Sequence, residues 1–119
     1  MNLRITLPLA CLLLCGCANN STENLIEPAP FIEYVTYTQH IKPIIDSKCI
    51  QCHSNPTQFG APMPLTTYEL VKAAITQRPL LEKISKSQGD PGLMPQGGPR
   101  LPQATIDLFY KWYAQGMQQ

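Results

Sequence analysis

The five residues CIQCH, Cys49 to His53, carry the groups in this chain that are best suited to chemistry. Two thiols separated by two residues can form a disulfide, half of a zinc site or a covalent haem attachment, and the histidine directly after them favours the haem. A turn of helix places both thiols on one side, each able to add to a vinyl group of the porphyrin. We therefore predict that Cys49 and Cys52 form thioethers to one haem c, with His53 as the proximal iron ligand.

Two other interpretations of the CIQCH motif need features that the sequence does not clearly provide. A zinc site needs four ligands, and beyond the motif only His40 is an obvious candidate. A thioredoxin-like redox pair belongs next to a strand–helix–strand pattern, and none is visible. A structural disulfide between Cys49 and Cys52 stays open, because an export signal indicates an oxidising compartment.

Met94 is the predicted sixth ligand of the iron. It follows His53 by 41 residues, which is far enough for the chain to pass round a haem and return on its other face. It lies in a stretch, residues 87–102, with four prolines and four glycines that exclude regular structure. Met63 is expected to pack on the haem edge, and Met117 is set aside as part of a frayed end.

Three weaker expectations concern the surroundings of the iron. A main-chain carbonyl in residues 62–64 is expected to accept the Nδ1 proton of His53 and so to orient its ring. Arg100, just past the methionine loop, is a candidate partner for a haem propionate. Trp112 and Tyr113 are expected to pack the last helix on the first helix or on the ring.

The N-terminus resembles a bacterial lipoprotein signal. Ile5 to Leu14 form an apolar run of ten residues behind Arg4, too short to span a membrane and suited to a secretory leader. Leu14-Cys15-Gly16-Cys17 resembles a lipobox, which implies a signal peptide over residues 1–16 and a lipidated Cys17. A plain signal peptide containing cysteines is the alternative. By the same resemblance Asn19, which is not the aspartate associated with inner-membrane retention, favours the outer membrane.

The rest of the chain predicts a polar tether over residues 17–30 and one all-α domain over residues 31–119. Twelve prolines among 119 residues argue against long helices or central strands, and no stretch alternates with a two-residue period. Pro43 must delay or kink the first helix. Three to four short helices are expected, and each buries one apolar face. A capping box at Thr66 and Glu69 precedes the second helix, Pro79 precedes the third, and Gly116 can end the last. The four faces are Ile41, Ile44 and Ile45; Leu70, Val71, Ala74 and Ile75; Leu80, Leu81 and Ile84; and Ile106, Phe109, Trp112 and Tyr113.

Four segments in this order resemble the planctomycete-type cytochrome c domain, a small monohaem cytochrome c of the class I kind. They are HIKPIIDSKCIQCH, PLTTYELVKAAI, LMPQGGPRLP and TIDLFYKWYAQGM, and together they extend from about Phe31 to Met117. The resemblance implies a first and a last helix that cross beside the haem, iron ligation by His53 and Met94, and electron transfer. Relatives are often fused to larger proteins, whereas this domain stands alone behind its leader.

The predicted function is a one-electron carrier held by a lipid anchor on the periplasmic face of a membrane. Redox proteins are its expected partners, and a formal charge of +1 gives no reason to expect nucleic acid. The domain is expected to be monomeric and not an enzyme, although it could be a fixed subunit of a larger oxidoreductase. Two alternatives are a haem enzyme or gas sensor with an open or labile sixth position, and a haem-free lipoprotein stapled by a disulfide.

Overall fold

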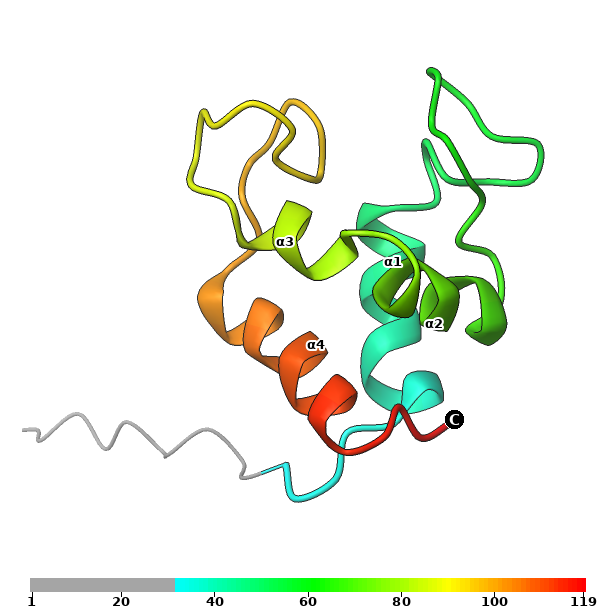
Figure 1. Ribbon diagram of the computed structural model, residues 1–119, viewed down its shortest axis with the longest axis vertical. Coiled ribbons are helices and arrows are strands. Elements are labelled where there is room, and N and C mark those ends of the chain that lie inside the picture. Colours follow the sequence, from blue (N-terminus) through cyan, green and yellow to red (C-terminus); the bar gives the residue numbers. More distant parts are fainter. Residues whose placement is uncertain (1–31) are drawn as a thin grey trace, which may run out of the picture. The chain divides into compact units, whose positions relative to one another are not determined.

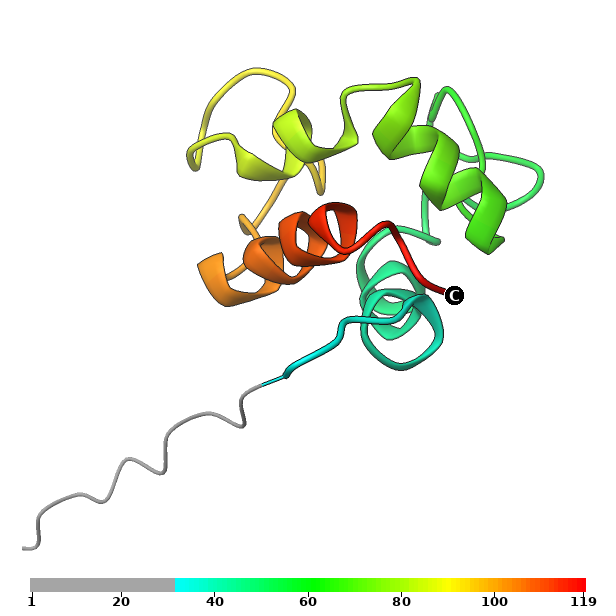
Figure 2. The same ribbon diagram turned by 60° about the horizontal axis from the view of Figure 1, so that its bottom comes forward.

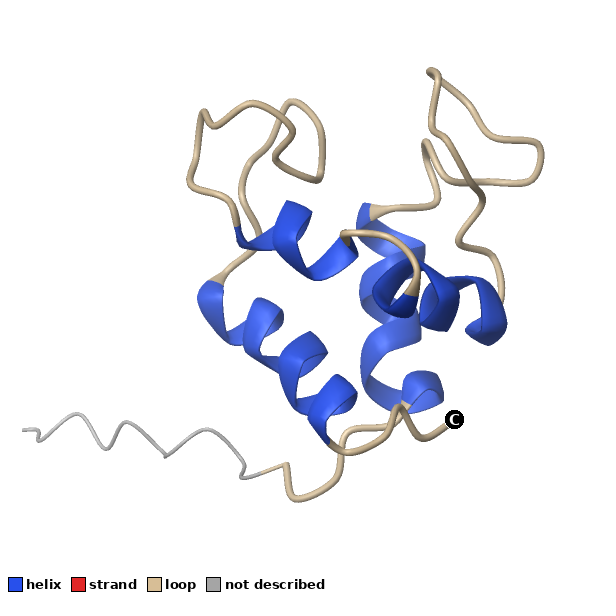
Figure 3. Cartoon of the chain, viewed as in Figure 1, coloured by secondary structure: helices blue, strands red, loops and turns tan. Residues whose placement is uncertain are grey.

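The fold is built of short helices joined by long loops. The computed structural model describes residues 32–119, and in this part of the chain it contains helices and no strand (Figure 3). The all-α prediction is therefore confirmed. The elements in chain order are the π-helical turn η1 (Tyr37–Ile41) and the helices α1 (Lys42–Lys48), α2 (Tyr68–Thr76), α3 (Leu80–Ser85) and α4 (Gln103–Ala114) (Figure 1).

The predicted leader, the lipidated Cys17 and the tether lie outside the described residues. No helix within residues 32–119 combines the length and the apolar character that crossing a bilayer requires.

Pro43 shapes the start of the first helix, as predicted. The α-helical part begins at Lys42 with Pro43 in its first turn. The preceding turn is wider, since Ile41 and Lys42 donate their main-chain N–H groups to the carbonyls of Thr36 and Tyr37, five residues back. Proline has no N–H and its ring crowds the carbonyl four residues earlier, so a widened turn suits the residues just before it.

The core lies where α4 packs on η1 and α3. Its largest fully buried side chains are Trp112, Phe109, Ile41, Ile45 and Ile106. The rings of Tyr37 and Trp112 stack with 5.9 Å between their centroids, which gives the expected contact between the first and last helices. The expectation for Tyr113 was wrong. Its side chain is 50% exposed, because the chain folds back beyond α4 over Trp112 and not over Tyr113.

The C-terminus is a packed segment, so the prediction that Met117 lies at a frayed end was wrong. Gly116 has a φ of +83° and donates its N–H to Tyr113, while Met117 donates to Trp112, five residues back. These two bonds form a Schellman motif, in which glycine adopts the left-handed backbone without strain. The side chain of Met117 is only 7% exposed, and the carbonyl of Gln118 accepts from the main chain of Tyr37.

Helices α2 and α3 are the remaining helices of the fold. The side chain that caps α2 belongs to Thr67, which accepts from the N–H of Leu70 at 3.3 Å, so the predicted cap at Thr66 was wrong by one residue. Pro79 precedes α3 as predicted, and Ile84 is the residue that α3 buries most deeply.

Two long loops extend from the same end of the group of helices. Residues 49–67 join α1 to α2, and residues 86–102 join α3 to α4. Both loops extend from the same end of the helices in Figure 1, and Figure 2 shows the same arrangement from a second direction.

Candidate functional site

One cavity brings the two loops and the helix ends together. Its volume is about 570 Å³, within the range of about 300–1,000 Å³ that is usual for small-molecule and cofactor pockets. Residues from the end of α1, both long loops, α3 and the region around the start of α4 line it. All four residues predicted to bind the haem are in this lining: Cys49, Cys52, His53 and Met94.

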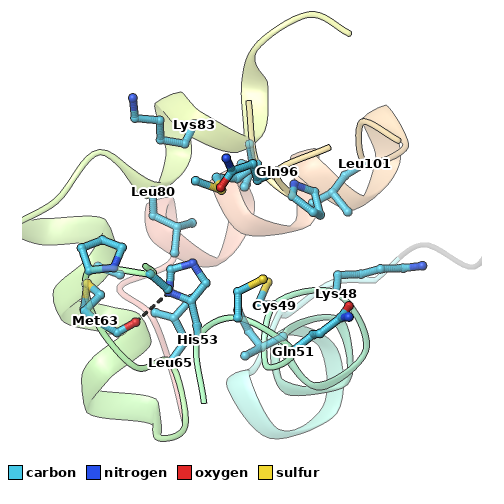
Figure 4. A pocket seen from close by; sticks show the side chains of 18 of the residues that line it. Lys48, Cys49, Gln51, His53, Met63, Leu65, Leu80, Lys83, Gln96 and Leu101 are labelled. Atoms are coloured by element: carbon cyan, nitrogen blue, oxygen red, sulfur yellow. Dashed lines mark hydrogen bonds between the residues drawn. The ribbon is translucent and has the colours of Figure 1, made fainter. Parts of the chain in front are cut away.

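A single turn after α1 positions the CIQCH motif. Cys49 ends the helix and donates its N–H to Ile45 at 2.9 Å. Its carbonyl in turn accepts from Cys52 at 3.1 Å and from His53 at 2.9 Å. The motif is thus held as a continuation of the helix, and its two cysteines are free thiols. Figure 4 shows the sulfur of Cys49 directed into the cavity.

The imidazole of His53 is oriented by a main-chain carbonyl. Its Nδ1 lies 2.7 Å from the oxygen of Met63, which confirms the prediction of an acceptor within residues 62–64 (Figure 4). A carbonyl can only accept, so Nδ1 carries the proton and Nε2 keeps a lone pair for a metal or a donor. The N–H of Leu65 also donates to the carbonyl of His53 at 2.8 Å, which ties the two ends of this turn together.

Met94 reaches the cavity from the second loop. Its N–H donates to the carbonyl of Lys83 in α3 at 3.0 Å, and the preceding Leu93 is buried. The side chain of Met94 is partly buried and belongs to the lining. In Figure 4 Leu80, Gln96 and Leu101 form the wall that faces Cys49 and His53. The cavity therefore receives an imidazole from the first loop and a thioether from the second.

Burial controls the charge state of Cys49. Removal from water, with a smaller contribution from Cys52, raises the pKa of the Cys49 thiol to about 11. The thiol is therefore protonated at neutral pH and is not the thiolate that a nucleophilic cysteine needs.

The charged residues around the cavity are all basic. Four cationic side chains belong to its lining, and none of the lining residues is an aspartate or a glutamate: Lys48, Arg78, Lys83 and Arg100. In Figure 4 the amines of Lys48 and Lys83 extend away from the middle of the cavity. The remaining lining is largely apolar, with side chains such as Ile45, Leu65 and Phe109. Such a site suits a largely apolar ligand that carries negative charge.

Sequence reasoning did not find every residue of the site. Arg78, Leu80 and Leu101 line the cavity, yet none of them was predicted as a site residue, because they meet only through the packing of separate elements. His40, considered as a ligand, lies in η1 and is not in the lining. Its Nδ1 accepts from the main-chain N–H of Thr36 at 3.0 Å. Within residues 32–119 no three His, Cys, Asp or Glu side chains are grouped so as to hold a metal ion.

No protein-family model matches this chain, and neither the curated proteins nor the solved structures include a significant match. The chemistry of the cavity therefore carries the functional argument.

Proposed function

We propose that the cavity binds one haem c and that the chain is a small monohaem cytochrome c of the class I kind, acting as a one-electron carrier. The observation that carries this proposal is that two thiols, an imidazole with a fixed Nδ1 proton and a thioether all line one cavity. The thiols and the imidazole are the groups that attach haem c and bind its iron, and the thioether is a common sixth ligand.

Within this proposal each residue has a defined role. Cys49 and Cys52 hold the porphyrin through thioethers, and the turn that follows α1 sets their spacing. His53 presents Nε2 to the iron because Met63 holds the opposite nitrogen. Met94 supplies sulfur from the second loop. The bound haem supplies reversible one-electron chemistry, and ligation by histidine and methionine raises its reduction potential.

In this proposal the protein transfers electrons and does not catalyse a reaction. A general acid or base must lie within hydrogen-bond reach of a substrate, and the lining contains no carboxylate for this task. His53, the one histidine in the lining, is assigned to the iron. The amines of Lys48 and Lys83 extend away from the cavity and are suited to an acidic surface on a redox partner.

The cellular setting of the proposal rests on the sequence alone. Cleavage before Cys17 and lipidation there would hold the domain on the periplasmic face of a bacterial membrane. The partners would be redox proteins, met either by a free carrier or within a larger oxidoreductase. Two alternatives differ in measurable ways, since a gas sensor binds carbon monoxide readily and a disulfide-stapled lipoprotein is colourless.

The test is an absorption spectrum of the exported protein, oxidised and reduced, from cells able to attach haem. The same sample is denatured and stained for haem that stays with the polypeptide. We expect a c-type spectrum, retained stain and a weak far-red band of iron–sulfur ligation. A double variant, Cys49→Ser with Cys52→Ser, is the control and should retain no stain. A colourless wild-type protein would exclude the cytochrome.

A further inference from the structure

The side chain of Arg100 joins the two ends of the loop that carries Met94. Arg100 donates from Nε to the carbonyl of Lys86 at 2.8 Å and from Nη1 to the carbonyl of Leu101 at 3.3 Å. Its Nη2 donates to Oε1 of Gln103 at 2.8 Å. Lys86 is the first residue after α3, and Gln103 is the first residue of α4. One guanidinium therefore joins the two ends of the loop.

The hydrogen bonds inside the loop organise its two halves separately. In the first half, Leu93 donates to Asp90, and Nζ of Lys86 donates to the carbonyl of Pro91. In the second half, Gly98 donates to Pro95. These bonds shape each half, and none of them joins one half to the other.

Arg100 supplies the connection between the halves. Within the described chain, each hydrogen bond that joins residues 86–90 to residues 96–102 has Arg100 as its donor. In addition to the bond to Lys86, its main-chain N–H donates to Oε1 of Gln88 at 2.7 Å. The side chain of Gln88 also lies against Gly98, where a Cβ would come within 2.9 Å of its Nε2. Arg100 therefore donates both hydrogen bonds across the base of the loop, one from its side chain and one from its main chain.

We infer that Arg100 is a positioning residue, which acts through the loop to hold the Met94 thioether in the haem cavity. This inference rests on the proposed function. It gives Arg100 a role different from the propionate partner expected from the sequence, because three of its five N–H donors already bind the protein. The planar fork of arginine can bind a carbonyl on each side at once, and a lysine ammonium lacks this geometry.

Arg78 is a natural comparison residue for Arg100. Both are arginines in the lining of the same cavity. Arg78 is exposed, and within residues 32–119 its side chain has no hydrogen bond to the protein, whereas Arg100 is half-buried. A variant of Arg78 removes the same charge from the cavity and leaves the loop closed. We call the three hydrogen bonds of the Arg100 guanidinium the clamp. The Arg78 variant therefore separates electrostatic effects on the haem from loss of the clamp.

Loss of the clamp is expected to release Met94 more often. A hydrogen bond to a charged group is typically worth a factor of roughly ten to a hundred in an equilibrium. Met94 itself is fixed by its N–H bond to Lys83 and by the burial of Leu93, which hold the main chain and not the sulfur. An open loop base should therefore raise the fraction of protein with an empty sixth position by about tenfold or more.

The experiment compares haem-loaded wild type, Arg100→Gln, Arg100→Lys and Arg78→Gln. The far-red band of the oxidised protein measures methionine ligation, and carbon monoxide uptake by the reduced protein measures an open sixth position. We expect Arg100→Gln to have a weaker far-red band and to bind carbon monoxide about tenfold faster, with Arg78→Gln like wild type. Arg100→Lys keeps the charge but not the fork, so it should show an intermediate loss.

Each other outcome has a definite meaning. Equal behaviour of Arg100→Gln and Arg78→Gln would overturn the clamp while leaving the cytochrome intact. Wild type with haem but without the far-red band would overturn it too, since Met94 would not be a ligand. Wild type without haem would remove the proposed function and the clamp together. If Arg100→Gln fails to accumulate, Arg100→Lys decides in its place, and a full wild-type band in it would overturn the clamp.

Discussion

The Nδ1 atom of His53 lies 2.7 Å from the main-chain oxygen of Met63, so this nitrogen must donate a proton. The second histidine of the domain has the opposite arrangement. Nδ1 of His40 accepts the main-chain N–H of Thr36 at 3.0 Å, which places its proton on Nε2 when the ring is neutral. One histidine is therefore prepared to bind a ligand through Nε2, and the other is used to close a turn.

The two histidines should differ in nuclear magnetic resonance spectra of the reduced protein labelled with ¹⁵N. At a pH where both rings are neutral, we expect a slowly exchanging Nδ1 proton on His53 and none on His40. His40 is the internal control because it lies outside the cavity. A proton on Nε2 of His53 would contradict its orientation by Met63 and its role as an iron ligand.

Replacement of Met94 should open the sixth position without removing the haem. We expect Met94→Ala to keep the covalent haem stain, to lose the far-red band and to bind carbon monoxide readily when reduced. Met63→Leu is the matched control, since Met63 also lines the cavity but gives His53 its main-chain oxygen, which the substitution leaves in place. A Met94→Ala protein that still refuses carbon monoxide would exclude Met94 as the ligand.

Local sequence patterns predicted the residues of the site that lie within a single turn of the chain. The spacing of Cys49, Cys52 and His53 is a property of the turn after α1, and the motif therefore identified them without tertiary information. Met94 was found because prolines and glycines isolate it from regular structure. The helices were predicted from the spacing of their apolar residues, which is also a local pattern.

The parts that could not be predicted depend on hydrogen bonds in which main-chain carbonyls are the acceptors. The packed C-terminus is one case, because the carbonyl of Gln118 accepts from the indole of Trp112 and from the main chain of Tyr37, and a carbonyl has no sequence signature. The clamp at Arg100 is another, since its partners include the carbonyls of Lys86 and Leu101. Arginine at that position suggested a charge partner, and only the fold shows which acceptors lie nearby.

The thiol of Cys49 should be slow to react in protein made without haem attachment. Burial raises its pKa from 9.0 to about 11, so at pH 8 the folded state contains about a hundredfold less thiolate than an ordinary cysteine. We expect slow alkylation, mapped by mass spectrometry of the peptide containing Cys49, and much faster alkylation in denaturant. Equal rates in both conditions would show that Cys49 is not buried.

The same shift predicts how stability depends on pH in the haem-free chain. The fold favours the neutral thiol, so its contribution is complete below pH 9.0 and is lost as the pH rises toward about 11. Cys49→Ala should remove this part of the alkaline loss in thermal melts, and an unchanged pH profile in the variant would contradict the assignment.

Two adjacent threonines provide a direct test of the start of α2. The hydroxyl of Thr67 accepts from the N–H of Leu70, so Thr67→Ala should lower the free energy of unfolding by about 1 kcal/mol. Thr66 is exposed and does not cap the helix, and Thr66→Ala should change stability by less than about 0.5 kcal/mol. Chemical denaturation of the two variants measures both values. A larger effect at Thr66 would move the cap back to the position predicted from the sequence.

The last three residues should contribute more to stability than their position at the chain end suggests. The carbonyl of Gln118 accepts from Trp112 and Tyr37, the carbonyl of Met117 accepts from the hydroxyl of Tyr68 at 2.8 Å, and the side chain of Met117 is buried. Removing residues 117–119 breaks these three bonds and the bond from the N–H of Met117 to Trp112, each worth about 1 kcal/mol, and exposes core.

We therefore expect that truncation to lower the free energy of unfolding by about 3–5 kcal/mol, measured by denaturant titration. Deletion of Gln119 alone is the control, because Gln119 is exposed and should be lost at little cost. Tyr68→Phe removes only the bond to Met117 and should cost about 1 kcal/mol. Equal stability of the two truncated proteins would mean that the chain beyond Gly116 does not hold α4 against η1.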